Sequence, residues 1–163
     1  MDADFETVSW NSAKSMDGRT KAIASNIRDV TVHGGMASMG STTPEDFELM
    51  FKIAYESGDA SQVAALYEEE AVYVQPGSEQ VVVGRAGIEA AVAATYQFLS
   101  DIEVVFHESE MFEVVGEYAY CHGSSTTNFS LSDGTRHSAK SRSTTVLHRG
   151  EDGLWRLALD HAS

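Results

Sequence analysis

Two kinds of hydrophobic pattern divide the chain. From Thr43 to about Leu99, most apolar residues recur every three or four positions, which is the spacing of amphipathic helices. After Asp101 apolar and polar positions alternate over long stretches, which is typical of β-strands. Residues 1–42 show neither period and are rich in Ser, Thr, Gly and Asn. The pattern therefore predicts a helical half followed by a strand half, with a segment before them that lacks a core pattern.

Three helices are expected in the first half. Thr43 is a suitable N-cap for the first, with Pro44 at the first helical position, and Gly58 ends this helix. Asp59 caps the second helix, and the third follows Gly84. The apolar stripe of the third helix consists of Ile88, Ala91, Val92, Thr95 and Leu99. Two short strands are predicted between the second and third helices, in the stretches AVYVQPG and EQVVVG.

Four long strands are expected in the second half. They span roughly residues 102–115, 117–130, 137–149 and 154–161, and glycine-containing turns separate them. Helices that come first and an antiparallel meander that comes second predict a single α+β domain over residues 43–163.

The leader, residues 1–42, differs from the rest in charge as well as in pattern. It carries five acidic and four basic residues, whereas the remaining residues carry twenty and seven. Three interpretations stay open: a disordered tail, an extension upstream of a later start at Met36 or Met39, or part of an expression tag. We expect no catalytic role for the leader.

The composition excludes several kinds of partner. The net charge of −14 argues against nucleic acid and against anionic membrane surfaces, since both require clusters of Lys and Arg. Cys121 is the only cysteine, so an internal disulfide is impossible and a reducing compartment is favoured. No apolar run is long enough to span a membrane, and the N-terminus lacks the apolar core of a signal peptide. We therefore expect a cytoplasmic protein.

Known cofactor and metal motifs are absent from the sequence. The six histidines show no HxH or HxxxH spacing, so no metal site is predicted. The chain has no GxSxG elbow, no P-loop and no GxGxxG fingerprint, so no bound cofactor is predicted.

The order of predicted elements resembles the nuclear transport factor 2-like superfamily. The stretch GDASQVAALYEEEAVYVQPGSEQVVVGRAGI is similar to the pattern of SnoaL-like and ketosteroid isomerase-like proteins. The stretch TTVLHRGEDGLWRLALDH resembles the final hairpin of the SgcJ/EcaC group and of the kinase association domain of calcium/calmodulin-dependent kinases. This resemblance covers residues 44–163. It implies that three N-terminal helices pack in a curved antiparallel sheet, a cystatin-like cone with a pocket. Because the fold hosts isomerases, cyclases, hydrolases, dehydratases and non-catalytic binders, it does not define one activity.

Ketosteroid isomerase provides a specific test of activity, because its mechanism needs an Asp base, a Tyr and a protonated Asp. Alignment of this chain with that family places Phe51 at the Tyr position, Gln75 at the base position and Thr145 at the second Asp position. None of these side chains can abstract a proton near neutral pH. We therefore expect no steroid isomerisation by the usual mechanism.

Strand alternation predicts which side chains line the pocket. If Arg149 pairs with Leu154 across the last turn, Ser143, Thr145 and Asp160 share the inner face. The resemblance to the kinase association domain places His122 at a pocket position, with Tyr120 on the same face. The full candidate site is Phe51, Tyr55, Tyr73, Gln75, Tyr120, His122, Ser143, Thr145 and Asp160, where Phe51 and Tyr55 form an apolar floor.

His122 and Asp160 form the only plausible acid/base pair in this set. A carboxylate beside an imidazole orients it and favours its charged form, which suits proton transfer near neutral pH. Gln75, Ser143 and Thr145 would then orient a substrate oxygen. The alternative is that His122 is a core histidine with satisfied hydrogen bonds and that Asp160 is a surface residue.

Two functions remain open from the sequence. The first is an enzyme that acts by proton transfer on a small, mostly apolar organic molecule, of the isomerase, cyclase, hydrolase or dehydratase type. The second is a non-catalytic module for ligand binding or dimerisation. A homodimer is expected in either case, because an outer stripe of Val146, Trp155, Leu157 and Leu159 would otherwise face water.

Overall fold

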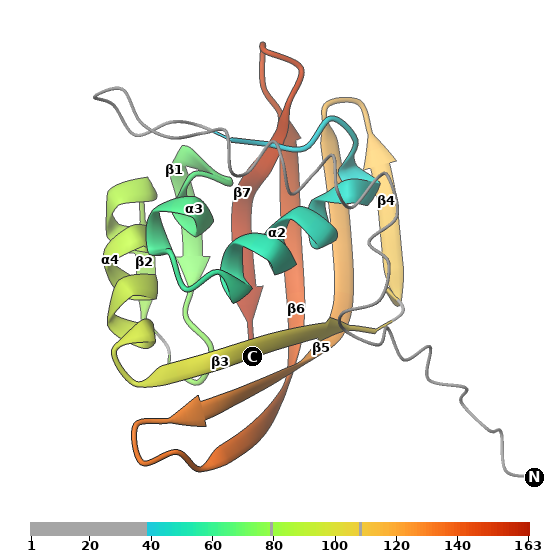
Figure 1. The fold of residues 1–163 in the computed structure, drawn as a ribbon. Coiled ribbons are helices and arrows are strands. Elements are labelled where there is room, and N and C mark those ends of the chain that lie inside the picture. Colours follow the sequence, from blue (N-terminus) through green and yellow to red (C-terminus); the bar gives the residue numbers. More distant parts are fainter. Residues whose placement is uncertain (1–38, 79, 108) are drawn as a thin grey trace, which may run out of the picture.

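The computed structural model describes residues 39–163 except residues 79 and 108. It confirms the predicted α+β fold, with helices packed on one face of a curved, unclosed seven-stranded sheet (Figure 1). The predictions for residues 1–38 lie outside the described residues. Among the helices that the structure describes, none is both long and apolar enough to cross a lipid bilayer.

The helices begin where the capping residues predict. A short 3-10 turn, η1 (Pro44–Asp46), leads into α2 (Phe47–Glu56), and the hydroxyl of Thr43 donates to Asp46 at 2.9 Å. Asp59 caps α3 (Ala60–Ala64) by accepting a hydrogen bond from the Ser61 amide at 2.9 Å. The helix α4 (Arg85–Tyr96) follows Gly84, whose φ of 86° favours glycine. Its end at Tyr96 leaves Leu99, predicted as helical, at the start of the next strand.

The strands form one sheet in the order β2-β1-β7-β6-β5-β3, with β4 also paired to β5. Their bounds are β1 (Tyr67–Val74), β2 (Val81–Val83), β3 (Leu99–Phe106), β4 (Met111–Val115), β5 (Tyr118–Leu131), β6 (Arg136–Arg149) and β7 (Trp155–Ala162). All pairs are antiparallel except β1 with β7, which run parallel. No hairpin joins β1 to β7, so no tight turn forces them to run in opposite directions.

The strand predicted over residues 102–115 is two strands in the structure. Both β3 and β4 pair with the same edge of β5, β3 with its second half and β4 with its first half. Phe106 pairs with Ser125, and Met111 pairs with His122. Between these two pairs, four residues of the chain that forms β3 and β4 lie opposite two residues of β5. This irregularity interrupts the ladder and allows the edge to bend, which contributes to the curvature of the sheet.

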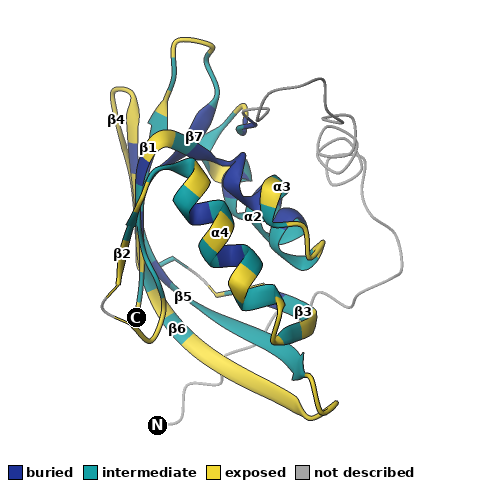
Figure 2. Cartoon of the chain, turned by 90° about the vertical axis from the view of Figure 1, so that its left-hand side faces the viewer, coloured by how far each residue is buried: buried dark blue, intermediate teal, exposed yellow. Residues whose placement is uncertain are grey.

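The core lies between the helices and the concave face of the sheet (Figure 2). Its largest fully buried side chains include Tyr67, Leu66, Ile88 and Leu157. In Figure 2 the buried residues concentrate on the inward sides of α2, α3 and α4 and on the strands behind them. The far ends of β5 and β6 extend beyond the helices, where β6 is exposed and β5 is of intermediate burial.

Residues 39–41, which the charge pattern assigned to the leader, pack against the domain. The Met39 amide donates to the carbonyl of Ala65 at 2.8 Å, and Ser41 forms a bridge with Trp155. The side chain of Met39 belongs to the core cluster, and Arg156 donates to the Met39 carbonyl at 2.8 Å. The packed part of the chain thus includes residues that carry no helix or strand period in the sequence.

The hairpin of β6 and β7 differs from the predicted register in two places. Arg149 pairs with Trp155 rather than with Leu154, which turns Trp155 and Leu157 toward the core. A bulge then falls between the pairs Leu147–Leu157 and Val146–Leu159, and it shifts the alternation by one residue. Because the two differences cancel, Asp160 still faces inward, opposite Thr145. The predicted outer stripe is wrong for Trp155 and Leu157, which are both buried.

Candidate functional site

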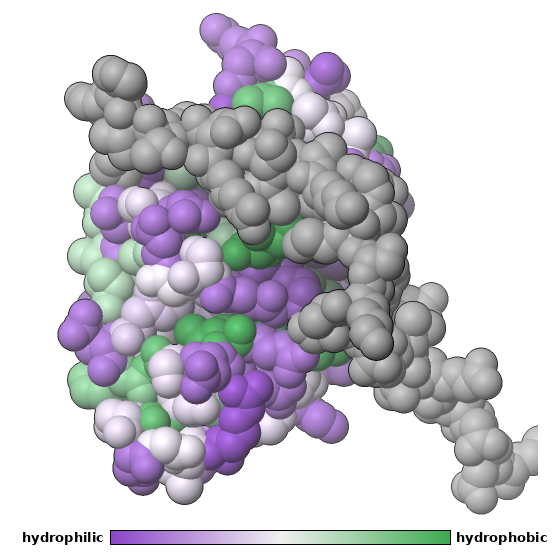
Figure 3. Space-filling model, viewed as in Figure 1, coloured by the Kyte–Doolittle hydropathy of each residue, from purple (hydrophilic) through white to green (hydrophobic). Residues whose placement is uncertain are grey.

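A pocket of about 130 Å³ opens between α2 and the concave face of the sheet. One side is aromatic and the other consists mainly of small hydroxyl-bearing side chains on β5 and β6. The aromatic residues are Phe47, Phe51, Tyr55, Tyr67, Tyr73 and Phe106. The hydroxyl-bearing residues are Ser124, Ser125, Thr127, Ser141, Ser143 and Thr145. Figure 3 shows apolar groups between hydrophilic ones on the helical side of the molecule.

One cross-strand row runs through the pocket and organises it. Cys121 on β5 pairs with Thr145 on β6, Thr145 with Asp160 on β7, and Asp160 with Tyr73 on β1. All four side chains line the pocket. Residues that are paired in this way lie side by side on one face of the sheet. The row therefore places a thiol, a hydroxyl, a carboxyl and a phenol next to one another.

Asp160 is a buried carboxyl in this row, with 8% of its surface exposed. Its Oδ2 accepts a hydrogen bond from the hydroxyl of Tyr67 at 2.7 Å. Burial raises the pKa of Asp160 to about 6, while the Tyr67 hydrogen bond and the nearby His161 oppose part of that rise. Among the residues that the structure describes, Oδ1 has no hydrogen-bond partner. That oxygen is therefore available to a molecule in the pocket.

The tyrosines near Asp160 stay protonated at neutral pH. Tyr67 is 1% exposed, and burial together with the Asp160 charge holds its pKa well above the usual range. Burial raises the pKa of Tyr73 and Tyr55 as well, and the charge of Asp160 adds to both shifts. The rings of Tyr67 and Tyr73 meet edge to face with centroids 6.2 Å apart. These phenols can donate hydrogen bonds but cannot act as bases.

The aromatic floor comes from α2. Phe51 stacks on Tyr55 with ring centroids 5.7 Å apart, and Tyr55 packs against Tyr96 of α4 at 5.6 Å. The hydroxyl of Tyr96 donates to the carbonyl of Tyr55 at 2.8 Å, which fixes α4 to the end of α2. This packing gives the pocket one rigid apolar wall.

A second carboxyl, Glu48, lines the pocket from the first turn of α2. The Cys121 thiol donates to its Oε1 at 3.7 Å, and the Ser109 hydroxyl also interacts with it. Burial raises the pKa of Glu48, and these two contacts oppose the rise. Burial likewise raises the pKa of Cys121, so its thiol is not activated as a nucleophile.

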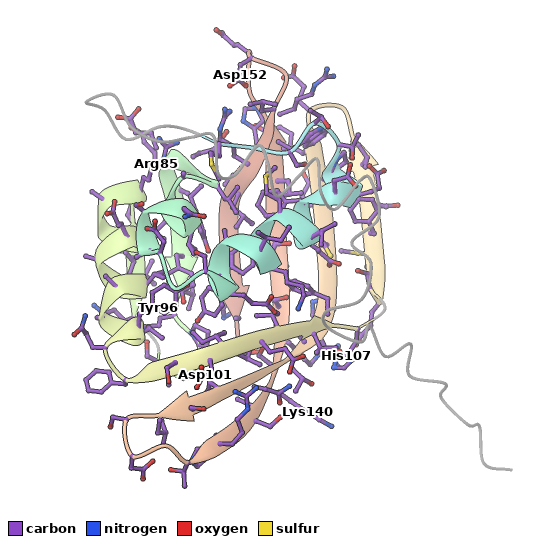
Figure 4. The ribbon with its side chains drawn as sticks, viewed as in Figure 1. Arg85, Tyr96, Asp101, His107, Lys140 and Asp152 are labelled. Carbon is purple, nitrogen blue, oxygen red and sulfur yellow. The ribbon has the colours of Figure 1, made fainter. Side chains whose placement is uncertain are left out.

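An exposed imidazole, His107, lines the pocket at the end of β3. Its Nε2 lies 2.9 Å from the hydroxyl of Thr126. Figure 4 places His107 and Tyr96 at opposite ends of β3, close to β5 and α4 respectively. Of the histidines that the structure describes, His107 alone lines this pocket.

Six of the nine residues predicted for the site line the pocket. These are Phe51, Tyr55, Tyr73, Ser143, Thr145 and Asp160. The other three lie elsewhere. Gln75 begins the turn between β1 and β2. There its backbone N–H donates to the carbonyl of Gln80, and its backbone carbonyl accepts from the N–H of Ser78. Tyr120 and His122 lie on the outer face of β5.

The predicted dyad of His122 and Asp160 is wrong, because the two side chains lie on opposite faces of the sheet. His122 pairs with Thr144, and its Nδ1 lies 2.8 Å from the Thr144 hydroxyl. Its Nε2 lies 2.9 Å from Arg142 Nη2, which also contacts Glu110. The family resemblance predicts the wrong face of β5 for His122. The pairing of β5 with β6 places Cys121, not His122, in the row of Thr145 and Asp160.

Glu48, Tyr67 and Cys121 are among the pocket residues that the site prediction missed. Glu48 lies three positions before Phe51 and seven before Tyr55, so the helical period could have placed it on the same face. Tyr67 and Asp160 are separated by 93 residues, so no local sequence pattern connects them. Cys121 pairs with the pocket residue Thr145 and so faces inward, while the next residue, His122, faces outward because side chains alternate along a strand.

The arrangement suits acid/base chemistry on a small molecule. Across residues 39–163, leaving aside 79 and 108, no three His, Cys, Asp or Glu side chains gather closely enough to hold a metal ion. The pocket instead offers a carboxyl of raised pKa, neutral phenols and hydroxyls that can orient polar atoms.

Comparison with known families decides the identity of the domain. The model of the SnoaL-like domain matches residues 47–158, which is more than half of the chain. The chain belongs to the SnoaL-like family. No curated protein matches this SnoaL-like chain significantly.

Solved structures similar to this SnoaL-like protein share its fold. A protein from Xanthomonas campestris, described as a candidate calcium/calmodulin-dependent protein kinase II association domain, is 20% identical with a TM-score of 0.63, and the match covers 82% of this chain and 96% of that chain. A ketosteroid isomerase-like protein from Erwinia carotovora atroseptica is 18% identical with a TM-score of 0.58, covering 69% and 89%. A candidate dehydratase of the nuclear transport factor 2-like family from Streptomyces avermitilis is 23% identical with a TM-score of 0.58, covering 69% and 86%. These similarities show that the SnoaL-like protein shares the fold of these proteins, one of which is described as nuclear transport factor 2-like.

Proposed function

We propose that this SnoaL-like protein catalyses a proton transfer on a small, mostly apolar organic molecule, with Asp160 as the acid/base. The observation that carries the proposal is the buried carboxyl of Asp160, whose pKa is raised to about 6 and whose Oδ2 is held by Tyr67. The reaction belongs to the isomerase, cyclase, hydrolase or dehydratase type. The names of similar structures, which include an isomerase-like protein and a candidate dehydratase, agree with this class.

Asp160 has the properties that a general base near neutral pH requires. A carboxylate with a raised pKa is a stronger base than an exposed Asp, yet it remains mostly ionised above pH 6. In the proposed step Oδ1 accepts a proton from a carbon next to a carbonyl group of the substrate. The neutral carboxylic acid that forms then returns this proton to another atom of the same molecule, so atoms and charges balance.

The surroundings of Asp160 orient the reaction. The Tyr67 hydroxyl fixes Oδ2 and leaves Oδ1 toward the pocket. The phenol of Tyr73 and the hydroxyls of Ser143 and Thr145 line the same cavity and supply donors for a substrate oxygen that becomes negative. The stacked rings of Phe51 and Tyr55 provide the apolar contact area for the rest of the substrate.

Hydrogen–deuterium exchange tests this proposal without knowledge of the product. The full chain is incubated in D₂O with a panel of small cyclic and aromatic ketones, and loss of each α-proton is followed by ¹H NMR. We expect the wild type to accelerate exchange of at least one ketone. Asp160→Asn should slow that exchange by about a hundredfold or more. His122→Asn is the matched control and should leave the rate unchanged.

The second candidate is a non-catalytic ligand-binding module. It is favoured by the hydrogen bond between Tyr67 and Asp160, which satisfies one carboxylate oxygen without any ligand. Ketones that bind in the pocket but exchange no faster than in buffer would support this alternative and contradict catalysis. Assignment to the SgcJ/EcaC subgroup and location in the cytoplasm stay predictions.

We also propose a homodimer through the outer sheet face. A row of apolar side chains crosses this face through directly paired positions: Tyr120, Val146, Leu159, Val72 and Val83. Met111, Val115 and Tyr118 flank the row, and each is substantially exposed. A monomer rarely exposes so continuous an apolar patch, and a second copy related by a two-fold axis is the simplest cover.

Light scattering tests the dimer. The full chain at micromolar concentration should give the mass of two copies, and Val146→Asp should give the mass of one. Ser132→Asp adds the same charge on the far turn of β5 and β6 and should remain dimeric. A monomeric wild type would refute the proposal.

A further inference from the structure

Apart from the imidazole of His107, the charged side chains that line the pocket among the described residues are of one sign. Two carboxyl groups, Glu48 and Asp160, face the cavity, whereas no lysine or arginine lines it in the part of the chain that the structure describes. Neither carboxyl forms an ion pair with any described residue. A carboxylate removed from water is stabilised by a cation or by strong hydrogen bonds. In this pocket only neutral groups supply such contacts.

We propose that the ligand of this pocket is a small aromatic amine in its protonated form, and that Glu48 binds its ammonium group. This inference deepens the proposed function, on which it rests. Asp160 then faces the other end of the ligand and is free to act on it.

Glu48 is the better anchor because its partners are weak and displaceable. A thiol donor at 3.7 Å and a serine hydroxyl are poor substitutes for a charged donor. Asp160, by contrast, already receives a short hydrogen bond from a fully buried phenol. An ammonium group gains more from Glu48, where it replaces weak contacts with a charge-assisted hydrogen bond.

Aromatic residues close to Glu48 in the sequence of α2 line the same pocket. Phe47 is its neighbour in the helix, and Phe51 lies one turn further on the same side. The Phe51 ring centroid lies 6.5 Å from those of Phe47 and Phe106. The faces of such rings attract cations, and their bodies pack against an aromatic ligand. Carboxylate and rings together favour a cation over a neutral molecule of the same shape.

The spacing of the two carboxyls fits a ligand with its amine and its reactive carbon at opposite ends. Glu48 contacts Cys121, and Cys121 is separated from Asp160 by the single intervening residue Thr145 in the cross-strand row. Neighbouring strands lie about 4.8 Å apart, so the carboxyls are on the order of 10 Å apart. A ring with a short aminoalkyl chain spans that distance.

Binding of three probes with one skeleton tests the inference. The probes are 2-phenylethylamine, 2-phenylethanol and 3-phenylpropionate, which are a cation, a neutral molecule and an anion. Each is titrated into the ¹⁵N-labelled full chain at about pH 8 and about 0.5 M NaCl, where long-range attraction to the acidic protein is screened. We expect the amine to bind about tenfold more tightly than the alcohol, and the carboxylate to bind weakest.

Three variants locate the contact. Glu48→Gln should weaken amine binding about tenfold and leave alcohol binding within about twofold, which also shows that the pocket is intact. Asp160→Asn should weaken amine binding by less than about threefold, because its charge is further away. Glu151→Gln removes an exposed carboxylate on the turn before β7 and should change neither affinity.

The outcomes separate this inference from the proposed function. The amine proposal is overturned if the alcohol or the carboxylate binds as tightly as the amine or more tightly. It is also overturned if Glu48→Gln leaves the affinity for the amine unchanged. Neither result affects the exchange assay with Asp160→Asn. If none of the three probes shifts the NMR signals of any pocket residue, the amine proposal is overturned, and the result also counts against a ligand pocket.

Discussion

The two faces of strands β5, β6 and β7 use similar side chains in opposite ways. On the concave face Cys121, Thr145 and Asp160 form a row whose carboxyl is buried and, among the described side chains, is hydrogen-bonded only to a neutral phenol. One residue along each strand, on the convex face, His122, Thr144 and His161 form a second row. There His122 contacts an exposed arginine, Arg142, which is itself paired with a glutamate.

The difference shows that environment rather than residue type determines which side chain is suited to proton transfer near neutral pH. A histidine has the more suitable ordinary pKa, but His122 lies on the exposed face, where it contacts Thr144 and an arginine that is paired with a glutamate. An aspartate would ordinarily be too acidic, but burial moves the pKa of Asp160 to about 6. Chemistry near neutral pH is therefore possible on the concave face with the less obvious residue.

The largest difference between the faces should appear in stability. Leu157 lines the concave side and is 2% exposed, whereas Leu159 lies on the convex side. Leu157→Ala should lower the free energy of unfolding by about 2–5 kcal/mol, because it removes buried apolar contacts and leaves a cavity. Leu159→Ala should cost less than about 1.5 kcal/mol in the monomer. Both free-energy changes are measured by urea unfolding in the Val146→Asp background, which is the expected monomer. Val146→Asp alone is compared with Val146→Asp carrying Leu157→Ala or Leu159→Ala.

Asp160→Asn should make the protein more stable at high pH. The folded pKa of about 6 lies above the ordinary value of 3.8. The stability that this group contributes is therefore fully present below about pH 4 and is lost as the pH rises through 6. Asparagine carries no charge that must be buried, so the variant should gain about 1–3 kcal/mol at pH 8 and nothing near pH 4.

Urea unfolding of both proteins at the two pH values checks this prediction. His161→Gln, on the exposed side of the same strand, should show no comparable gain at pH 8. A loss of stability in Asp160→Asn at pH 8 would mean that the carboxylate is held by a favourable contact that outweighs its burial.

The smallest predicted effect concerns the pH profile. The rate of α-proton exchange should rise with pH around a midpoint of about 6, since only the carboxylate form of Asp160 accepts a proton. Tyr67→Phe removes the hydrogen bond that lowers this pKa, so the midpoint should move upward. Tyr120→Phe changes a phenol on the convex face and should leave the midpoint in place. A downward shift in Tyr67→Phe would contradict the role given to this hydrogen bond.

The sequence by itself determined the class of fold and the positions of most of its elements. The caps at Thr43 and Asp59, the end of α2 before Gly58 and the long alternating strands are local features, and each depends on residues close together in the chain. The family resemblance added the curvature of the sheet and the presence of a pocket. The split of β3 from β4 was not visible, because nothing in that stretch shows that both pair with β5.

Only the tertiary structure decided which side chains meet in the pocket. A change of one residue in strand register moves a side chain to the opposite face, and such a change depends on pairing partners far along the chain. This reason accounts for the wrong face of His122. The same reason applies to Asp160. Its side chain faces inward because the bulge in β7 cancels the one-residue shift in register at the turn between β6 and β7. The contact of Asp160 with Tyr67, across 93 residues, and its raised pKa exist only once β7 packs against the helices and β1.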